Sequence, residues 1–345
     1  MSQFRVAVTH DLGELDATLD ADVGLSVLEQ AGGVTYEVIP TASGPIEPGV
    51  LADFDGLLLL KPRVTAETLE GADRLAHIAR WGVGLDNVDV DACTQAGVLV
   101  TTAPDGVRRP VATAALTLLL ALSHNLLPKH RLLRSGRWDR TAHLGTGLTN
   151  RVMGLIGVGN IGRDLVGLIQ PLGMRVLAHD PYASTDEPGV EFVGLDQLLA
   201  ESDFVCICCP LTPETHHLIG KPELAAMKST ACLINPARGP IVDQGALVEA
   251  LRVGEIRAAG LDVFEQEPLP SDDPILELDN VIVAPHSLAW TDETMGRLGA
   301  SACGALVDFA NGRRPAHVFN PAVLDHPRLR ERFGAGGIQP AREAT

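Results

Sequence analysis

The stretch Arg151-Val-Met-Gly-Leu-Ile-Gly-Val-Gly-Asn-Ile-Gly-Arg163 is the strongest indication of the fold. Its apolar first half predicts a strand, and Gly157, Gly159 and Gly162 fit the pattern G-x-G-x-x-G that opens a helix. In this pattern the first glycine permits a tight turn, the second lets a pyrophosphate approach the backbone, and the third lets helix and strand pack closely. The first N–H groups of a helix are free to bind phosphate. The stretch therefore predicts a dinucleotide site.

The next predicted strand supports this interpretation. The run Met174–His179 ends at Asp180, 18 residues after Gly162. A carboxylate there can bind both hydroxyls of an adenosine ribose, and it repels the 2′-phosphate of NADP. We therefore expect NAD as the cofactor, with NADP less favoured. The residues expected to hold it here are Gly157, Gly159, Asn160, Ile161, Gly162 and Asp180.

Length, charge and cysteine usage narrow the classes of protein. A chain of 345 residues favours two domains, and its net charge of −17 argues against nucleic acid or an anionic membrane as partner. It has no run of about 18 apolar residues and no signal-peptide pattern, so we expect a cytoplasmic protein. The six cysteines are scattered, without paired C-x-x-C spacing. We interpret them as reduced thiols and expect no metal site.

Short apolar runs alternate with helical patterns along the chain. The runs expected to form strands before the glycine turn are Phe4–Val8, Tyr36–Ile39, Gly56–Leu60, Leu75–Arg80 and Val98–Val100. Those expected after Asp180 are Phe204–Cys208, Ala231–Ile234, Ala258–Leu261 and Val281–Val283. The main helices are expected at Leu12–Ala31, Val90–Ala96, Pro110–Ser135 and Thr291–Asn311. Continuous apolar strands suit parallel sheets covered on both faces, so we predict an α/β fold with two doubly wound parallel sheets.

Three polar side chains stand just beyond predicted strand ends: Arg238, Glu267 and His286. Ligands of open α/β sheets bind beyond the carboxyl ends of the strands. An arginine can hold a carboxylate with two hydrogen bonds, a histidine can exchange a proton near neutral pH, and a neighbouring carboxylate fixes the histidine tautomer. Singly, each has a structural interpretation, as a turn, loop or packed residue. Together, after a dinucleotide unit, they suit the oxidation of an alcohol beside a carboxylate.

These motifs resemble the D-isomer-specific 2-hydroxyacid dehydrogenases, which include D-lactate, glyoxylate/hydroxypyruvate and phosphoglycerate dehydrogenases. The resemblance runs from about residue 50 to residue 320. Its most specific features are the 29-residue spacing between Arg238 and Glu267 and the order Arg, Glu, His along the chain. The shared segments besides the glycine turn are Gly82-Val-Gly84-Leu-Asp-Asn87-Val-Asp89, Pro210-Leu-Thr-Pro-Glu-Thr215, Asn235-Pro-Ala-Arg238-Gly239, Leu261-Asp262-Val-Phe264, Glu267-Pro268 and Pro285-His286.

The resemblance implies a small anionic D-2-hydroxy acid or 2-keto acid as substrate. It implies that Arg238 holds the substrate carboxylate and polarises the carbonyl, that His286 is the general acid/base, and that Glu267 pairs with His286. Backbone N–H groups near Val83 and Gly84 would help to hold the carboxylate. Asp262 would bind the nicotinamide carboxamide. The remaining residues that it places along the cofactor are Cys208, Pro210 and Thr215.

The resemblance also implies the domain organisation. A flavodoxin-like substrate domain is expected from residues 1–102 and 286–330, and a Rossmann NAD-binding domain from residues 103–285. The tail, residues 331–345, is expected to be poorly ordered. In this family the long helix that begins at Pro110 commonly contributes to a dimer contact, so a homodimer is expected.

The chain departs from the common family pattern at three places: Thr113 replaces a glutamate, Cys208 a histidine, and Ser-Leu-Ala-Trp290 a glycine-bearing segment. The last departure bears on the substrate pocket. Lys61 and Arg63 follow a predicted strand end, where either could bind a second anionic or hydroxylated part of the substrate or lie in a solvated loop.

Two alternatives to an NAD-dependent 2-hydroxyacid dehydrogenase stay open. One is an NAD(H)-sensing scaffold with little turnover, like the transcriptional corepressors that share this fold. The other is oxidation of formate or of phosphonate (phosphite), by relatives whose pockets accept a very small anion. Assays with a panel of 2-keto acids would separate the scaffold from the enzyme.

Overall fold

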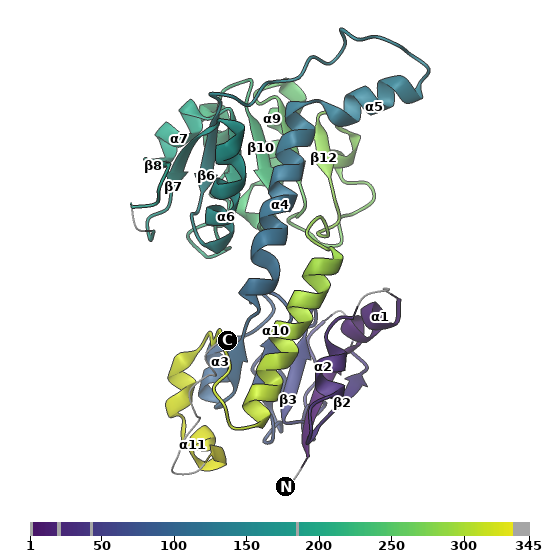
Figure 1. Ribbon diagram of the computed structural model, residues 1–345, viewed down its shortest axis with the longest axis vertical. Helices are drawn as coiled ribbons and strands as arrows, with labels where there is room; N and C mark the ends of the chain where they lie inside the picture. Colours follow the sequence, from purple (N-terminus) through teal and green to yellow (C-terminus); the bar gives the residue numbers. More distant parts are fainter. Residues whose placement is uncertain (1–2, 19–21, 42–43, 184–185, 334–345) are drawn as a thin grey trace. The chain divides into compact units, whose positions relative to one another are not determined.

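The computed structural model describes residues 3–18, 22–41, 44–183 and 186–333 (Figure 1). The chain folds into two compact units: unit 1, Met1–Val107 with Thr291–Thr345, and unit 2, Arg108–Trp290. Both boundaries lie five residues further along the chain than those expected from the sequence. Of the expected tail, residues 331–333 end a helix, and residues 334–345 lie outside the described residues.

Unit 1 contains a five-stranded parallel sheet of order β2-β1-β3-β4-β5, the order of flavodoxin-like folds. Its strands are β1 (Phe4–Thr9), β2 (Val34–Ile39), β3 (Gly56–Leu59), β4 (His77–Arg80) and β5 (Leu99–Thr101). Its helices are α1 (His10–Thr18), α2 (Leu25–Glu29), α3 (Val90–Gln95), α10 (Asp292–Ala310) and α11 (Pro327–Phe333). The mostly helical stretch expected over Leu12–Ala31 contains two helices, α1 and α2, and Gly24 directly before α2 has a left-handed φ of 100°.

Unit 2 contains a seven-stranded parallel sheet of order β12-β11-β10-β9-β6-β7-β8. Its strands are β6 (Val152–Ile156), β7 (Arg175–His179), β8 (Val190–Phe192), β9 (Phe204–Ile207), β10 (Cys232–Asn235), β11 (Ala258–Leu261) and β12 (Val281–Val283). Its helices after the glycine turn are α6 (Asn160–Ile169), α7 (Leu195–Glu201), α8 (Lys221–Ala226) and α9 (Gln244–Val253). The order reverses between β6 and β9, as in Rossmann folds, and the predicted pair of doubly wound parallel sheets is confirmed.

The long helix expected over Pro110–Ser135 is two helices, α4 (Pro104–Ser123) and α5 (Leu126–Arg134), bent by 57°. Asn125 between them has a left-handed φ of 50°, which ends the α-helical path. Among the described residues, no single helix has the length and apolar character needed to cross a membrane. The bent pair α4–α5 meets that requirement only when both helices are counted together, by length and composition.

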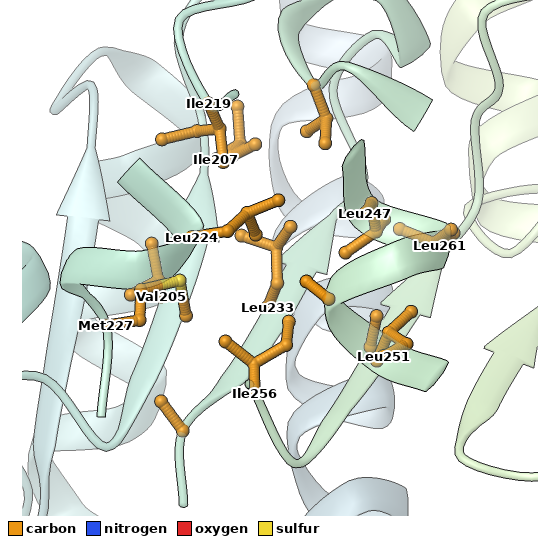
Figure 2. Packing of buried hydrophobic residues seen from close by; sticks show 14 of the residues in the cluster. Val205, Ile207, Ile219, Leu224, Met227, Leu233, Leu247, Leu251, Ile256 and Leu261 are labelled. Carbon is orange, nitrogen blue, oxygen red and sulfur yellow. The ribbon is translucent and has the colours of Figure 1, made fainter. Parts of the chain in front are cut away.

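Two apolar clusters cover the two faces of the unit 2 sheet. One joins the strands to α8 and α9, and Figure 2 shows Val205, Leu233 and Leu251 within it. The other packs α4 and α6 on the opposite face, through residues such as Leu118 and Leu165. Burying one such side chain contributes about 1.5–3 kcal/mol to the free energy of unfolding. The two clusters therefore stabilise the sheet that carries the loops at its strand ends.

Candidate active site

The glycine turn after β6 has room for a pyrophosphate. A Cβ on Gly157 would lie 2.7 Å from the amide nitrogen of Cys209, and one on Gly162 would lie 2.6 Å from the carbonyl oxygen of Gly157. At Gly159, by contrast, an added Cβ meets nothing within 4 Å among the described residues. Gly159 is also the N-cap of α6, without a side-chain cap on the first N–H groups. The turn therefore has open space at Gly159 and N–H donors at the start of α6, both of which suit a dinucleotide phosphate.

Asp180, at the end of β7, lies against this turn. Its Oδ2 accepts a hydrogen bond from the backbone N–H of Val158 at 2.8 Å, within the glycine motif. Its Oδ1 accepts from the N–H groups of Tyr182 and Ala183, at 2.9 and 3.1 Å. The carboxylate is thus held beside the glycine turn.

The loop after β9 borders the same turn. Cys208 donates its backbone N–H to the carbonyl of Ile156 at 2.7 Å. The hydroxyl of Thr215 donates to the Pro210 carbonyl at 2.8 Å and accepts from the backbone N–H of Thr212, so it closes this loop. Within the described ranges, no group of three or more His, Cys, Asp or Glu side chains is arranged to hold a metal ion.

Arg238 stands on a turn that Asn235, the buried last residue of β10, holds in place. The Asn235 amide donates to the Arg238 carbonyl at 2.8 Å and accepts from the Ala237 N–H at 3.0 Å. A Cβ on Gly239 would lie 1.9 Å from the carbonyl atoms of Phe264, so only glycine lets the turn approach the loop after β11. The guanidinium donates to the carbonyl of Ala237 at 2.7 Å.

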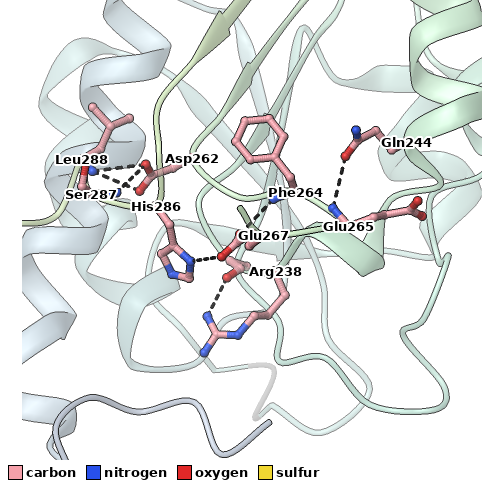
Figure 3. A network of polar contacts seen from close by, with 10 residues as sticks. Arg238, Gln244, Asp262, Phe264, Glu265, Glu267, His286, Ser287 and Leu288 are labelled. Carbon is pink, nitrogen blue, oxygen red and sulfur yellow. Dashed lines mark hydrogen bonds and ion pairs between the residues drawn. The ribbon is translucent and has the colours of Figure 1, made fainter. Parts of the chain in front are cut away.

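His286 and Glu267 form a hydrogen-bonded pair beside this turn (Figure 3). His286 Nδ1 lies 2.7 Å from Glu267 Oε2, and the other oxygen of Glu267 accepts from the Phe264 N–H at 3.0 Å. The side chains are 46% and 37% exposed, so the pair is open to a ligand. Because the carboxylate engages Nδ1, a ligand of this ring would be met by Nε2.

Glu267 is ionised at neutral pH. Burial alone would raise the pKa of Glu267, but the hydrogen bond and charge of His286, the Phe264 N–H and the charge of Arg238 outweigh it. The pKa of Glu267 therefore lies below its ordinary value. Glu267 therefore presents a negative charge to the Nδ1 side of His286.

Asp262 holds the segment that follows His286. Its carboxylate, in a residue only 4% exposed, accepts hydrogen bonds from the N–H groups of Ser287 and Leu288 at 2.9 and 3.2 Å. Burial raises the pKa of Asp262, and these backbone donors oppose that shift. The contact with a nicotinamide carboxamide stays a prediction.

The expected substrate residues Lys61, Val83 and Gly84 lie in unit 1. Arg80 donates from Nε to the Gly84 carbonyl at 2.9 Å, so it shapes the loop that contains Val83 and Gly84. Lys61 is exposed, and its backbone N–H donates to Asp11 at 2.8 Å. Their part in substrate binding stays a prediction.

The structure also contains a histidine–carboxylate pair that the sequence analysis missed. His217 Nε2 lies 2.5 Å from Glu265 Oε1. Glu265 stands two residues before Glu267, and His217 two residues after Thr215, so both lie next to motifs already singled out. Their 48-residue separation leaves no local pattern by which a sequence would pair them.

Comparisons with known proteins identify the family. Residues 116–287 match the model of the D-isomer specific 2-hydroxyacid dehydrogenase NAD binding domain. Glyoxylate reductase of Korarchaeum cryptofilum is 41% identical over 280 residues, which are 79% of this chain and 84% of that protein. D-3-phosphoglycerate dehydrogenase of Methanocaldococcus jannaschii is 38% identical over 310 residues, 88% of this chain but 59% of that protein.

A solved structure shows the same likeness. D-lactate dehydrogenase with NAD+ from Lactobacillus jensenii has a TM-score of 0.74 and 28% identity, over 91% of this chain and 99% of that one. The chain belongs to the D-isomer specific 2-hydroxyacid dehydrogenase family. It is an oxidoreductase that acts on 2-hydroxy acids and binds a nicotinamide cofactor.

Proposed function

We propose that this protein interconverts a small D-2-hydroxy acid and its 2-keto acid with NAD(H), with His286 as the acid/base. The observation that carries the proposal is the 2.7 Å contact of His286 with Glu267, in the same unit as Arg238 and the glycine turn. A histidine whose Nδ1 is held by an ionised carboxylate is prepared to exchange a proton through Nε2.

Each residue of the set has a separate task in this mechanism. The bound nicotinamide supplies the redox chemistry. His286 accepts the hydroxyl proton at Nε2 during oxidation and returns it to the carbonyl oxygen during reduction. Arg238 binds the substrate carboxylate with its planar guanidinium and stabilises negative charge on the reacting oxygen. Asp262 fixes Ser287 and Leu288, so the segment after His286 keeps its path.

Asp180 is the reason to propose NAD rather than NADP. A carboxylate beside the glycine turn accepts hydrogen bonds from ribose hydroxyls and repels a 2′-phosphate. Removing a hydrogen bond to a charged group costs about 1.5–3 kcal/mol, so Asp180→Ala should weaken NADH binding by about tenfold or more and improve NADPH relative to NADH. Fluorescence titration with both cofactors measures this, with exposed Asp196→Ala on α7 as the control. Unchanged NADH affinity would contradict the placement of the ribose.

We also propose a homodimer, in which α5 and the segment after it take part. These residues expose Leu126, Leu133, Trp138 and Leu144, the last two by 81% and 87%. Large exposed apolar side chains gathered in one region commonly mark a protein interface. Sedimentation of the full chain should give twice the chain mass, and Leu144→Asp should shift it toward the monomer. A wild-type monomer at micromolar concentration would refute the dimer.

The decisive experiment is NADH oxidation against a panel of 2-keto acids: glyoxylate, hydroxypyruvate, pyruvate, phenylpyruvate and sugar-derived acids. Glyoxylate comes first, because a relative covered over 84% of its length is named glyoxylate reductase. Turnover with one acid supports the dehydrogenase. Tight NADH binding with no turnover on any acid would favour the scaffold, and NAD+ reduction by formate or phosphite would favour the small-anion alternative.

A further inference from the structure

Two histidine–glutamate pairs are attached to one short loop of unit 2. The loop after β11 carries Glu265 and Glu267, two residues apart. Glu267 binds His286 at 2.7 Å, and Glu265 binds His217 at 2.5 Å. In Figure 3 the side chains of Glu265 and Glu267 point away from one another, with Gln244 beside Glu265 and His286 beside Glu267. The loop is therefore held from both sides.

His217 connects this loop to the turn of Arg238. Its backbone N–H donates to the carbonyl of Pro240 at 2.8 Å, two residues after Arg238. Ile219 then pairs with Val242, so the chain after His217 runs beside the chain after Arg238. One residue thus contacts the arginine turn through its backbone and the glutamate loop through its ring.

The backbone of His217 is unfavourable for a residue with a side chain. Its φ of 51° lies in the left-handed region, as does the φ of 54° at His286. Non-glycine residues adopt this region rarely, and they do so mainly where surrounding contacts enforce it. The two residues that bind the glutamates of this loop therefore share the same strained conformation.

The His217–Glu265 contact is poorly suited to a purely stabilising role. The side chains are 41% and 34% exposed, and ion pairs this open to water contribute little to folding stability. The Glu265 backbone has one anchor in the Gln244 side chain, which accepts its N–H at 3.1 Å. The His217–Glu265 pair adds a second anchor, which ties the Glu265 side chain to the segment that contacts the arginine turn.

We propose that His217 and Glu265 are positioning residues, which hold the loop so that Glu267 keeps His286 in the orientation for proton exchange. This inference rests on the proposed role of His286. A misplacement of about 1 Å can reduce the rate by up to about 100-fold, so loss of this remote anchor should lower kcat by about 3- to 30-fold. Binding of NADH should not change, because the glycine turn and Asp180 are untouched.

A double-mutant cycle tests the inference. With glyoxylate and NADH, or the fastest acid of the panel, His217→Ala and Glu265→Ala should each lower kcat, and His217→Gln, which retains a donor, should recover part of it. In the Glu267→Ala background, His217→Ala should change kcat by less than about twofold, because the pair acts through Glu267. A general loss of structure would reduce kcat in both backgrounds and would overturn the proposal.

The controls separate this proposal from the proposed function. Lys221→Ala, which alters an exposed side chain at the start of α8, should keep wild-type kcat. If His286→Ala abolishes turnover but both His217→Ala and Glu265→Ala keep the wild-type kcat, only the positioning role fails. If His286→Ala itself retains turnover, the proposed function fails first. Thermal unfolding of each variant identifies any that lose the fold, and for these His217→Gln replaces His217→Ala in the cycle.

Discussion

Histidines 77 and 286 occupy opposite environments in the two units. His77 begins β4 and is fully buried, and its ring centroid lies 5.0 Å from that of Phe309. Its Nε2 contacts the Thr101 hydroxyl at 2.9 Å, whereas its Nδ1 has no hydrogen-bond partner among the described residues. His286 follows β12, is 46% exposed and is paired with Glu267. Burial without a carboxylate keeps His77 neutral, whereas the carboxylate beside His286 is the feature on which the proposed role of His286 in proton exchange rests.

The largest expected difference between the two histidines is catalytic. His286→Ala should lower kcat by about 10²–10⁴, the usual contribution of a positioned acid/base, with KM for NADH nearly unchanged. Steady-state kinetics with the fastest acid of the panel measure it. Loss of NADH binding in this variant would instead indicate misfolding or a wrong assignment.

Glu267→Gln tests whether the carboxylate is what distinguishes His286. The amide keeps an acceptor for Nδ1 but lacks the charge that stabilises the protonated imidazole. Hydrogen bonds to charged groups contribute about 1.5–3 kcal/mol, so kcat should fall by about 10- to 100-fold. If Glu267→Gln retained full kcat, the hydrogen bond alone would suffice and the charge argument would be wrong. Glu265→Gln, two residues away, is a comparison variant that should have a smaller effect.

The sequence predicted those features that depend on local patterns. Glycine spacing and continuous apolar runs identified the glycine turn and most strands of both sheets, and the fold class is confirmed. The break at Asn125 was missed because one left-handed residue leaves the apolar period intact. Strand β8 (Val190–Phe192) was missed because the charged Glu191 in its middle interrupts the apolar run.

Long-range contacts set the limit of sequence-based prediction at the site. Arg238, Glu267 and His286 were singled out because each follows a strand end, and the structure brings them into one unit. The role of each stays a prediction. No sequence pattern pairs His217 with Glu265, since only the fold brings together residues 48 positions apart. For the same reason His77, within a run expected to be a strand, could not be recognised as a buried neutral imidazole.

The smallest effect concerns stability rather than turnover. Burial lowers the pKa of His77 from 6.5 to about 3, so between these values the unfolded chain binds a proton that the native chain does not. The free energy of unfolding should therefore fall as pH falls below 6.5, by up to about 1.4 kcal/mol per pH unit and by about 2 kcal/mol from pH 7 to pH 5. Urea titrations across this range should show a smaller fall for His77→Gln, which removes the titrating ring but keeps a polar partner for Thr101. Exposed His130→Gln should retain the wild-type dependence of the unfolding free energy on pH. If His77→Gln showed that same dependence, His77 would be protonated in the native state or other groups would dominate acid unfolding.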